Sequence, residues 1–497
     1  MSNIGKRTLL FAPYANWTLH FETDLELAQR ALDESDDLTI VYCDGELPAC
    51  EPNPMHKSVM CRMCKARRDR GFQWLGHDNV TYLSLSDIGK VDTASIRHTI
   101  DTCRSIEDVK KFEINGSDIG LSAVSSTVSY FREPKLHWET HGAVLRGFFA
   151  TALTVHQRFY YFLEKERFDR IILFNGRYST FRPLVRLAQK HRVELLVHER
   201  GYTFGKFNIS YGTYPHSIEF VENEIFRYAH NSELDRVKRQ VGREWFEERK
   251  KGKMQNWKPF TKEQQKGLLP EKLQSTTFNV AIFNSSEDEF VAIEEWKNPY
   301  YPDQNSGIRK ILESFHEHKK VHFFLRVHPN LKKIENSQTR ELKAIDKQYE
   351  NLTIIPPHSP VNTYDLIEAS DLVITFGSLV GIEAAYAEKP TIVMGKAPYL
   401  ILGSCIMPIS HQAMVQIVLD FMRHGILPAT QNNAYLYGYY MKRAGIPYKY
   451  VIQTDISSAL LKKNGKRVDL SKTPGVYLSW IERGVLKLWK VIRGRAD

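Results

Sequence analysis

The residues best suited to chemistry are polar side chains that directly follow short apolar runs in the second half of the chain. They form four groups: Ser285-Ser286-Glu287-Asp288-Glu289, His328-Pro329-Asn330, Pro357-His358-Ser359 and Gly377-Ser378. Apolar runs that alternate with helical patterns predict parallel strands, whose carboxyl ends meet at one edge of a sheet. Hydroxyl groups, histidines and a helix N-terminus at that edge are suited to an anion. The pattern therefore predicts a site for the phosphates of a nucleotide.

The last of these groups lies in residues 370–399, whose pattern indicates a strand, a turn, a helix and a second strand. Gly377 lets the backbone come close to a ligand, and Ser378 offers a hydroxyl at or near the N-cap of a helix expected at 379–388. Glu383 lies one turn into that helix, where its carboxylate can hydrogen-bond a polyol such as a ribose. For the turn alone, an ordinary strand-to-helix connection with a capping serine is the alternative interpretation.

A second candidate site lies in the first half of the chain, where cysteines are spaced C-x6-C-x10-C-x2-C. Its members are Cys43, Cys50, Cys61 and Cys64. The C-x2-C pair allows two thiolates to reach one metal ion, and the other two can complete a tetrahedral site. We expect a structural metal, zinc ahead of an iron–sulfur cluster, because four thiolate ligands leave no open position for catalysis. Free thiols or a C-x2-C redox pair are the alternatives.

Composition sets few limits on function. The chain has 497 residues, of which 42% are hydrophobic and 25% charged, as in soluble globular proteins. Its net charge of +10 is compatible with a polyanion, an anionic lipid surface or a phosphorylated substrate. We find no apolar run of membrane-spanning length and no secretory signal, and the cysteine usage fits a reducing compartment. We therefore expect a cytoplasmic protein.

Strand and helix patterns alternate in two stretches, which predicts an α/β protein with two doubly wound domains. The expected organisation is an N-terminal Rossmann-like domain at 1–230 with a Cys-rich segment at 43–70, a linker helix and connection at 231–275, a second doubly wound domain at 276–470, and a C-terminal helix at 471–497. Within the tail, residues 477–495 place tryptophans beside a basic face. This pattern is typical of a helix on the inner, anionic face of the plasma membrane, or of a helix packed back across the domains.

Two segments resemble a known family. L-R-V-H-P-N at 325–330 and A-S-D-L-V-I-T-F-G-S-L-V-G-I-E-A at 369–384 are similar to the nucleotide-binding domain of bacterial capsule and surface-polysaccharide glycosyltransferases of the GT-B fold. Related motifs occur in capsule Kdo transferases, polysialyltransferases and CDP-glycerol glycerophosphotransferases. The resemblance extends over residues 278–399 and implies two Rossmann-like domains facing a cleft.

The resemblance also implies roles for individual residues. His328 and Ser378 would contact the donor phosphate, and Glu383 would reach the ribose. A single serine, Ser378, stands where the sialyl and glycerophosphate enzymes typically carry a pair, so the donor nucleotide stays open among CMP, UDP and GDP. The full set of expected donor-binding residues is Ser285, Ser286, His328, Pro329, His358, Gly377, Ser378 and Glu383.

Inverting transfer requires a base on the acceptor hydroxyl, and enzymes of this fold bind their donors without a metal. Glu199 is the first candidate base, with His198 and His20 behind it, because each is expected at a strand end of the first domain. The alternative interpretation is a buried His198–Glu199 pair that holds the strand end. Glu287 or Asp288 is a second source of the base, and a retaining reaction would need none.

Together these patterns predict a glycosyltransferase that moves a sugar from a nucleotide-sugar to a surface or capsular polysaccharide, either free or lipid-linked. A polyol-phosphate transferase and a sugar-nucleotide epimerase are alternatives with the same fold. A zinc-containing nucleic-acid-binding protein is an alternative of another class, supported by the charge of +10 and the cysteines. A non-catalytic membrane scaffold would leave His328 and Ser378 without a role. The doubly wound second domain argues against nucleic acid as a partner.

Overall fold

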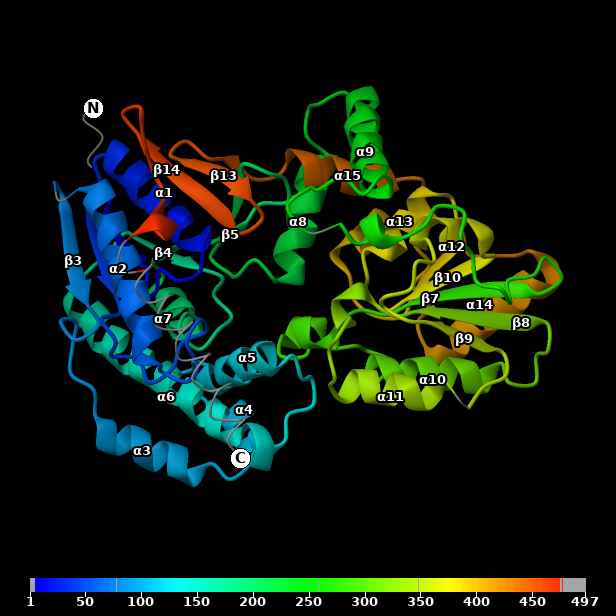
Figure 1. Ribbon diagram of the computed structural model, residues 1–497, viewed down its shortest axis with the longest axis horizontal. Coiled ribbons are helices and arrows are strands. Elements are labelled where there is room, and N and C mark those ends of the chain that lie inside the picture. Colours follow the sequence, from blue (N-terminus) through cyan, green and yellow to red (C-terminus); the bar gives the residue numbers. More distant parts are fainter. Residues whose placement is uncertain (1–4, 77, 258, 347, 474–475, 477–497) are drawn as a thin grey trace, which may run out of the picture. The chain divides into compact units, whose positions relative to one another are not determined.

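The computed structural model describes residues 5–76, 78–257, 259–346, 348–473 and Val476, and it divides into two units (Figure 1). The first unit contains the described residues of Met1–Phe131, Leu136–Pro215 and Gly445–Asp497. The second contains Arg132–Lys135 and His216–Ala444. Each unit has its own sheet and core, so the α/β fold with two doubly wound, Rossmann-like units that the sequence predicts is confirmed.

The sheet of the first unit has the strand order β12-β6-β5-β4-β1-β2-β3. Its strands are β1 (Arg7–Phe11), β2 (Asp37–Tyr42), β3 (Val80–Ser84), β4 (Arg170–Phe174), β5 (Glu194–Arg200), β6 (Lys206–Tyr211) and β12 (Ile446–Pro447). Strands β1 to β5 pair in parallel, and β6 and β12 pair antiparallel at one edge. The central strands are apolar on both faces because helices cover both sides. The strand order reverses between β1 and β4.

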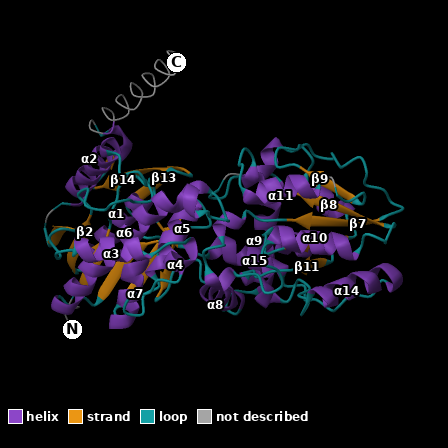
Figure 2. Ribbon diagram, turned by 90° about the horizontal axis from the view of Figure 1, so that it is seen from below, coloured by secondary structure: helices purple, strands orange, loops and turns teal. Residues whose placement is uncertain are grey.

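The helices of the first unit surround this sheet (Figure 1). They are α1 (His20–Asp33), α2 (Ser58–Leu75), α3 (Thr93–Thr102), α4 (Ile106–Lys110), α5 (Ile119–Phe131), α6 (Trp138–Lys165) and α7 (Arg182–His191). A small antiparallel sheet, β13 (Val451–Asp455), β14 (Ser458–Lys463) and β15 (Lys466–Val468), follows near the end of the chain. It lies beside α1 in both views (Figures 1 and 2), and Leu461 is buried in the same core cluster as Leu25.

The sheet of the second unit is parallel, with the order β11-β10-β7-β8-β9. Its strands are β7 (Phe278–Phe283), β8 (Val321–Arg326), β9 (Leu352–Ile355), β10 (Leu372–Thr375) and β11 (Thr391–Val393). Its helices are α8 (Ile218–Ala229), α9 (Asp235–Lys250), α10 (Gln304–Ser314), α11 (Ser337–Ile345), α12 (Thr363–Ala369), α13 (Val380–Tyr386), α14 (His411–His424) and α15 (Ala434–Arg443). The strand order reverses between β7 and β10.

Both boundaries of the second unit differ from those expected from the sequence. Helix α9 lies in the expected linker, yet it belongs to the second unit, because its Trp245 is fully buried and packs edge-on against Tyr437 of α15. Residues from Gly445 onward return to the first unit, whereas the expected second domain ran to residue 470. The helix expected at 477–495 lies outside the described residues.

No helix among the described residues combines the length and the apolar character needed to cross a membrane.

Candidate active site

The reversal of strand order in the second sheet brings predicted site residues to adjacent strands. Ser285 follows β7, Ser378 follows β10 on one side of it, and His328 follows β8 on the other. Open α/β sheets bind ligands outside the carboxyl ends of the strands at such a reversal. The three residues therefore lie where the sequence predicts the nucleotide phosphate site.

His328 is held in one orientation by its neighbours. Its backbone N–H donates to Asn284 Oδ1 at 2.9 Å, and its ring Nδ1 accepts from the Asn330 N–H at 3.2 Å. Burial, and next the positive charge of Arg132, lowers the pKa of His328 to about 4. The ring is therefore neutral at pH 7, and because Nδ1 is an acceptor, we assign the proton to Nε2. That N–H can donate to a phosphate oxygen.

Gly377 and Ser378 form the turn between β10 and α13. Gly377 has φ of 111°, and a Cβ there would collide with the Lys396 carbonyl oxygen. Ser378 Oγ accepts from the Val380 N–H at 3.3 Å, but the N-cap of α13 is Leu379, so Ser378 lies one residue before the cap position. The helix is shorter than predicted, since it begins at Val380 and ends at Tyr386. The hydroxyl proton of Ser378 is still available to a ligand.

Glu383, predicted to reach the ribose, is buried in the second unit and forms an ion pair with Arg249 of α9. The sequence analysis had assigned α9 to a linker and therefore missed this partner. The ion pair engages the carboxylate oxygen Oε1, and the Tyr364 hydroxyl is a further hydrogen-bond partner of this carboxylate.

Arg132 is a candidate that the sequence analysis missed. Its guanidinium donates to Asp288 Oδ2 at 3.0 Å, to Ser286 Oγ at 3.2 Å and to the Asn330 carbonyl at 3.0 Å. Ser286 Oγ also donates to Asp288, so both are committed to a network within the protein. The network places a guanidinium close enough to His328 to lower the pKa of that histidine.

The remaining predicted donor-site residues have different surroundings. Ser285 is buried, and its N–H donates to Gln304 Oε1 at 2.8 Å. Pro329 begins the short 3-10 turn Pro329–Leu331, where its missing N–H costs nothing. His358 is exposed and follows β9, which is the edge strand of the sheet.

Glu287, the second source of a base, is buried at the start of a 3-10 turn, Glu287–Glu289. Its carboxylate accepts from the Gln304 N–H at the beginning of α10, and its own N–H donates to Gln338 Oε1 at 3.1 Å. Burial raises the pKa of Glu287 to about 7. Glu287 is thus suited to proton transfer near neutral pH, while it also caps α10.

The first sheet gathers the other predicted base candidates near its own reversal of strand order. Asn175 follows β4, His20 begins α1 after β1, and Glu199 is near the end of β5. Asn175 Nδ2 donates to Glu199 Oε2 at 2.8 Å, and His20 Nδ1 lies 3.8 Å from Glu199 Oε1. Burial first, and then the charges of nearby groups, lowers the pKa of His20 well below its usual value. His20 is therefore neutral at pH 7 and Glu199 is oriented by an amide.

His198 has another partner. It is fully buried, and its Nε2 lies 2.7 Å from Asp24 Oδ1 on α1. Successive residues of a strand face opposite sides of a sheet. His198 and Glu199 therefore point apart, and the expected His198–Glu199 pair is replaced by His198–Asp24. This arrangement suits His198 to positioning α1 against β5 rather than to contact with a substrate.

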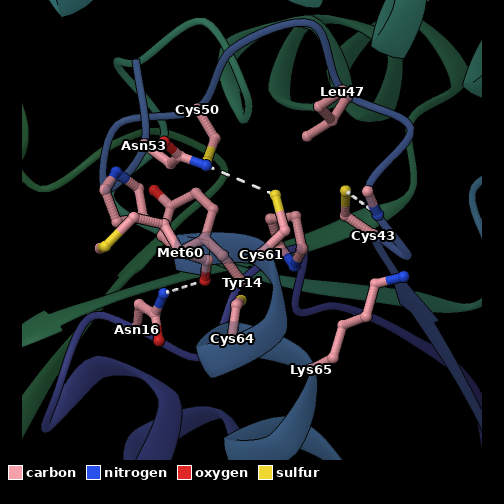
Figure 3. Close-up of a pocket in the computed structure, with 13 residues that line it drawn as sticks. Tyr14, Asn16, Cys43, Leu47, Cys50, Asn53, Met60, Cys61, Cys64 and Lys65 are labelled. Atoms are coloured by element: carbon pink, nitrogen blue, oxygen red, sulfur yellow. Dashed lines mark hydrogen bonds between the residues drawn. The ribbon is translucent and has the colours of Figure 1, made fainter. Parts of the chain in front are cut away.

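Four of the five cysteines of the first unit, Cys43, Cys50, Cys61 and Cys64, line one pocket (Figure 3). Among the described residues, however, no three His, Cys, Asp or Glu side chains are placed to share a metal ion, so the predicted zinc or iron–sulfur site is not supported as it stands. Burial raises the pKa of Cys43 to about 12 and raises those of Cys50 and Cys64.

Comparison with known proteins adds a family match. Residues 292–407 match the model of a family described as capsule polysaccharide biosynthesis protein. This segment contains His328, His358, Gly377, Ser378 and Glu383. A search of curated proteins found no relative of the chain.

Solved structures with similar folds include two Kdo transferases of KpsC from Thermosulfurimonas dismutans. The β-Kdo 2,4 transferase is 12% identical, with 61% of this chain and 84% of that chain covered and a TM-score of 0.36. The β-Kdo 2,7 transferase is 15% identical, with 66% and 89% covered and a TM-score of 0.34. UDP-GlcNAc 2-epimerase from Methanocaldococcus jannaschii is 12% identical, with 88% and 98% covered and a TM-score of 0.27. Likeness at this distance does not transfer an activity.

The family match covers β8 and β10 with His328, Gly377 and Ser378, whereas β7 and Ser285 lie before the matched segment. The predicted resemblance to proteins of capsule polysaccharide biosynthesis is thereby confirmed for residues 292–407.

Proposed function

We propose that this protein is a glycosyltransferase that moves a sugar from a nucleotide-sugar donor to a surface or capsular polysaccharide, free or lipid-linked. The observation that carries the proposal is the group formed by Ser285, Ser378 and His328 at the reversal of strand order in the second sheet. Most of this group lies within the segment that matches the capsule polysaccharide biosynthesis family.

In this proposal the second unit binds the nucleotide. The Nε2–H of His328 donates to a phosphate oxygen, and the Ser378 hydroxyl donates to another. The Arg132 guanidinium supplies nearby positive charge, which offsets the charge that develops on the leaving nucleotide. Gly377 keeps the backbone accessible, and the Glu383 carboxylate accepts a ribose hydroxyl. Each hydrogen bond to the charged phosphate contributes about 1.5–3 kcal/mol. The nucleotide is one of CMP, UDP and GDP.

The first unit supplies the base in an inverting reaction. Glu199 accepts the proton of the acceptor hydroxyl through Oε1, while Asn175 holds Oε2. A neutral His20 close to Oε1 can share that proton. The support for this assignment is the cluster itself, which lies at the carboxyl ends of the strands of the first sheet.

The test is thermal unfolding of the purified protein with CMP, CDP, UDP, GDP or ADP, on the wild type and on His328→Ala. A ligand at about 100 times its Kd stabilises the protein by roughly 2.7 kcal/mol. We expect one nucleotide to raise the unfolding temperature of the wild type and to have little effect on His328→Ala. His316→Ala is the matched control, because that histidine is exposed on the same unit.

If no nucleotide raises the unfolding temperature of the wild type at millimolar concentration, the proposed donor site is wrong. Once the nucleotide is known, incubation with the nucleotide-sugar alone separates the alternatives of the same fold. An epimerase releases a new sugar without an acceptor, whereas a transferase needs one. A polyol-phosphate transferase moves the phosphate together with the polyol, which mass spectrometry of the product detects.

We further infer that residues 477–495 attach the enzyme to an anionic membrane surface. The support is their sequence pattern, tryptophans beside a basic face. Sedimentation with phosphatidylglycerol vesicles should retain the full chain and release a chain that stops at Val476. Equal retention by phosphatidylcholine vesicles would contradict an electrostatic attachment.

A further inference from the structure

The cysteine pocket has features that the proposed glycosyl transfer does not use. Cys43 directly follows β2, and Cys50 lies in the irregular connection that leads to α2. Cys61 and Cys64 lie three residues apart in the first turns of α2, where they share one face of the helix. All four side chains line the same pocket (Figure 3), although 21 positions separate the first from the last.

Nitrogen donors point at three of these sulfur atoms. The Gly45 N–H donates to Cys43 Sγ at 3.3 Å, and the Ala15 N–H donates to Cys64 Sγ at 3.1 Å. The Asn53 side-chain amide donates to Cys61 Sγ at 3.4 Å, as the dashed line in Figure 3 shows. A neutral thiol is a weak acceptor, whereas a metal-bound thiolate is stabilised by such donors around the first ligand shell. In a metal-bound state, these N–H groups would stabilise the thiolates.

The chain around the pocket is anchored independently of any ion. Ala49 exchanges two hydrogen bonds with Thr151 Oγ1 on α6, at 3.1 and 2.7 Å. Glu51 accepts hydrogen bonds from side-chain hydroxyls at 2.7 to 2.8 Å, which come from Ser126, Ser179 and Thr180. The backbone on either side of Cys50 is therefore fixed to the first unit, and the connection carries its cysteines to the pocket without regular secondary structure.

The charge around the pocket also favours a thiolate cluster. A zinc ion with four thiolates has a net charge of −2, which needs positive neighbours. Lys65 lines the pocket, and Arg68 donates to the Cys43 carbonyl oxygen at 3.1 Å. Asp44 balances these two cations now, with Oδ2 3.1 Å from Lys65 Nζ and Oδ1 2.9 Å from Arg68. Asp44 is partly exposed and can turn to solvent.

We propose that this pocket is a structural zinc site whose ligands are the thiolates of Cys43, Cys50, Cys61 and Cys64. Tetrahedral coordination by four thiolates is the usual chemistry of such sites. Among the described residues the sulfur atoms do not lie at ligand positions, so coordination requires the cysteine side chains to rotate about their Cα–Cβ bonds. Zinc then joins the β2–α2 connection to α2.

The experiment measures metal in the full-length protein purified without chelators from zinc-supplemented cells. We expect about one zinc per chain by elemental analysis, as for a single tetrathiolate site. Replacement by Co²⁺ should give the intense visible absorption of tetrahedral cobalt with thiolate ligands. Cys50→Ser and Cys61→Ser should lose most of the zinc, whereas Cys405→Ser, which changes a cysteine in the second unit, should keep it.

Because the serine variants may unfold, a second measurement uses the unmodified chain. Zinc is removed with a chelator and restored while the thermal unfolding of the first unit is followed. We expect chelation to lower the unfolding temperature and added zinc to restore it. The protein should also compete strongly for zinc with a chromophoric chelator. Iron with acid-labile sulfide, a disulfide among these cysteines in mass spectra, or a metal-free protein with unchanged stability would each overturn the proposal.

Discussion

Arg249 and Glu383 are joined in a buried ion pair, although 134 positions separate them in the chain. The pair fixes α9 to α13 within the second unit. It also brings an arginine to the carboxylate that we assign to the ribose. A buried charge that loses its partner is far more costly than the pair is stabilising.

Arg249→Met should therefore destabilise the second unit by about 3–5 kcal/mol, because it leaves the Glu383 carboxylate buried without a cation. The double variant Arg249→Met with Glu383→Gln should recover most of that loss. Urea denaturation measures both. A single-variant loss below about 1 kcal/mol would show that the carboxylate is solvated, contrary to the packing of α9 described above.

Gly377→Ala should destabilise the second unit by at least about 2 kcal/mol, because alanine is strained at this φ and its Cβ meets a backbone carbonyl that cannot rotate away. Nucleotide binding should fall with it, since the turn must move. Gly425→Ala is the matched control. Its φ of 68° is also positive, but a Cβ there meets nothing within 4 Å among the described residues. Equal losses in the two variants would mean that the close approach at Gly377 is unimportant.

Glu199→Gln should lower kcat by about 100- to 10,000-fold, the usual contribution of a general base. The amide can still accept from Asn175, so the fold and nucleotide binding should be unchanged. Steady-state kinetics with the identified donor measure the effect, and Glu164→Gln, an exposed residue of the same unit, is the control. An unchanged kcat would assign the base elsewhere, and Glu287→Gln would be assayed next.

Glu287→Gln should become more stable relative to the wild type as pH rises. In the folded protein the pKa of Glu287 is about 7, against an ordinary value of 4.5, so folding favours the protonated carboxyl. Its favourable contribution is complete below pH 4.5 and is lost as pH rises through 7. The glutamine cannot ionise, so between pH 5 and 8 it should gain up to about 3 kcal/mol over the wild type. Urea denaturation at both pH values tests this, with exposed Glu317→Gln as control.

Much of the second sheet could be predicted from sequence, because its strands are short apolar runs with turn residues directly after them. The polar residues at the strand ends followed from the same pattern, and Ser378 and His328 indeed flank β7. What could not be predicted are contacts between distant segments. Arg132 lies in a stretch without periodicity, so nothing in the sequence pointed to its contacts with Ser286 and Asp288.

The errors have the same origin. The sequence of α9 is highly charged and therefore resembles that of a solvated linker. Trp245 packs α9 onto α15, but a single buried residue gives no periodic pattern in the sequence. The alternation of side chains between the two faces of β5 can be inferred from the sequence. The partner of His198 could not, because Asp24 lies 174 positions earlier in the chain. By contrast, the signal at Asn175 was available, since an Asn-Gly pair at a strand end marks a turn with polar side chains.

The return of the chain to the first unit at Gly445 sets an order of assembly during synthesis. Strand β12 pairs with β6, and Leu461 enters the core beside α1, so the first unit lacks these parts until nearly the whole chain has left the ribosome. The second unit, which ends at Ala444, has all of its residues earlier. The usual N-terminal-first order of domain maturation is therefore reversed, and a nascent chain stalled before residue 445 should expose the unfinished face of α1 to chaperones.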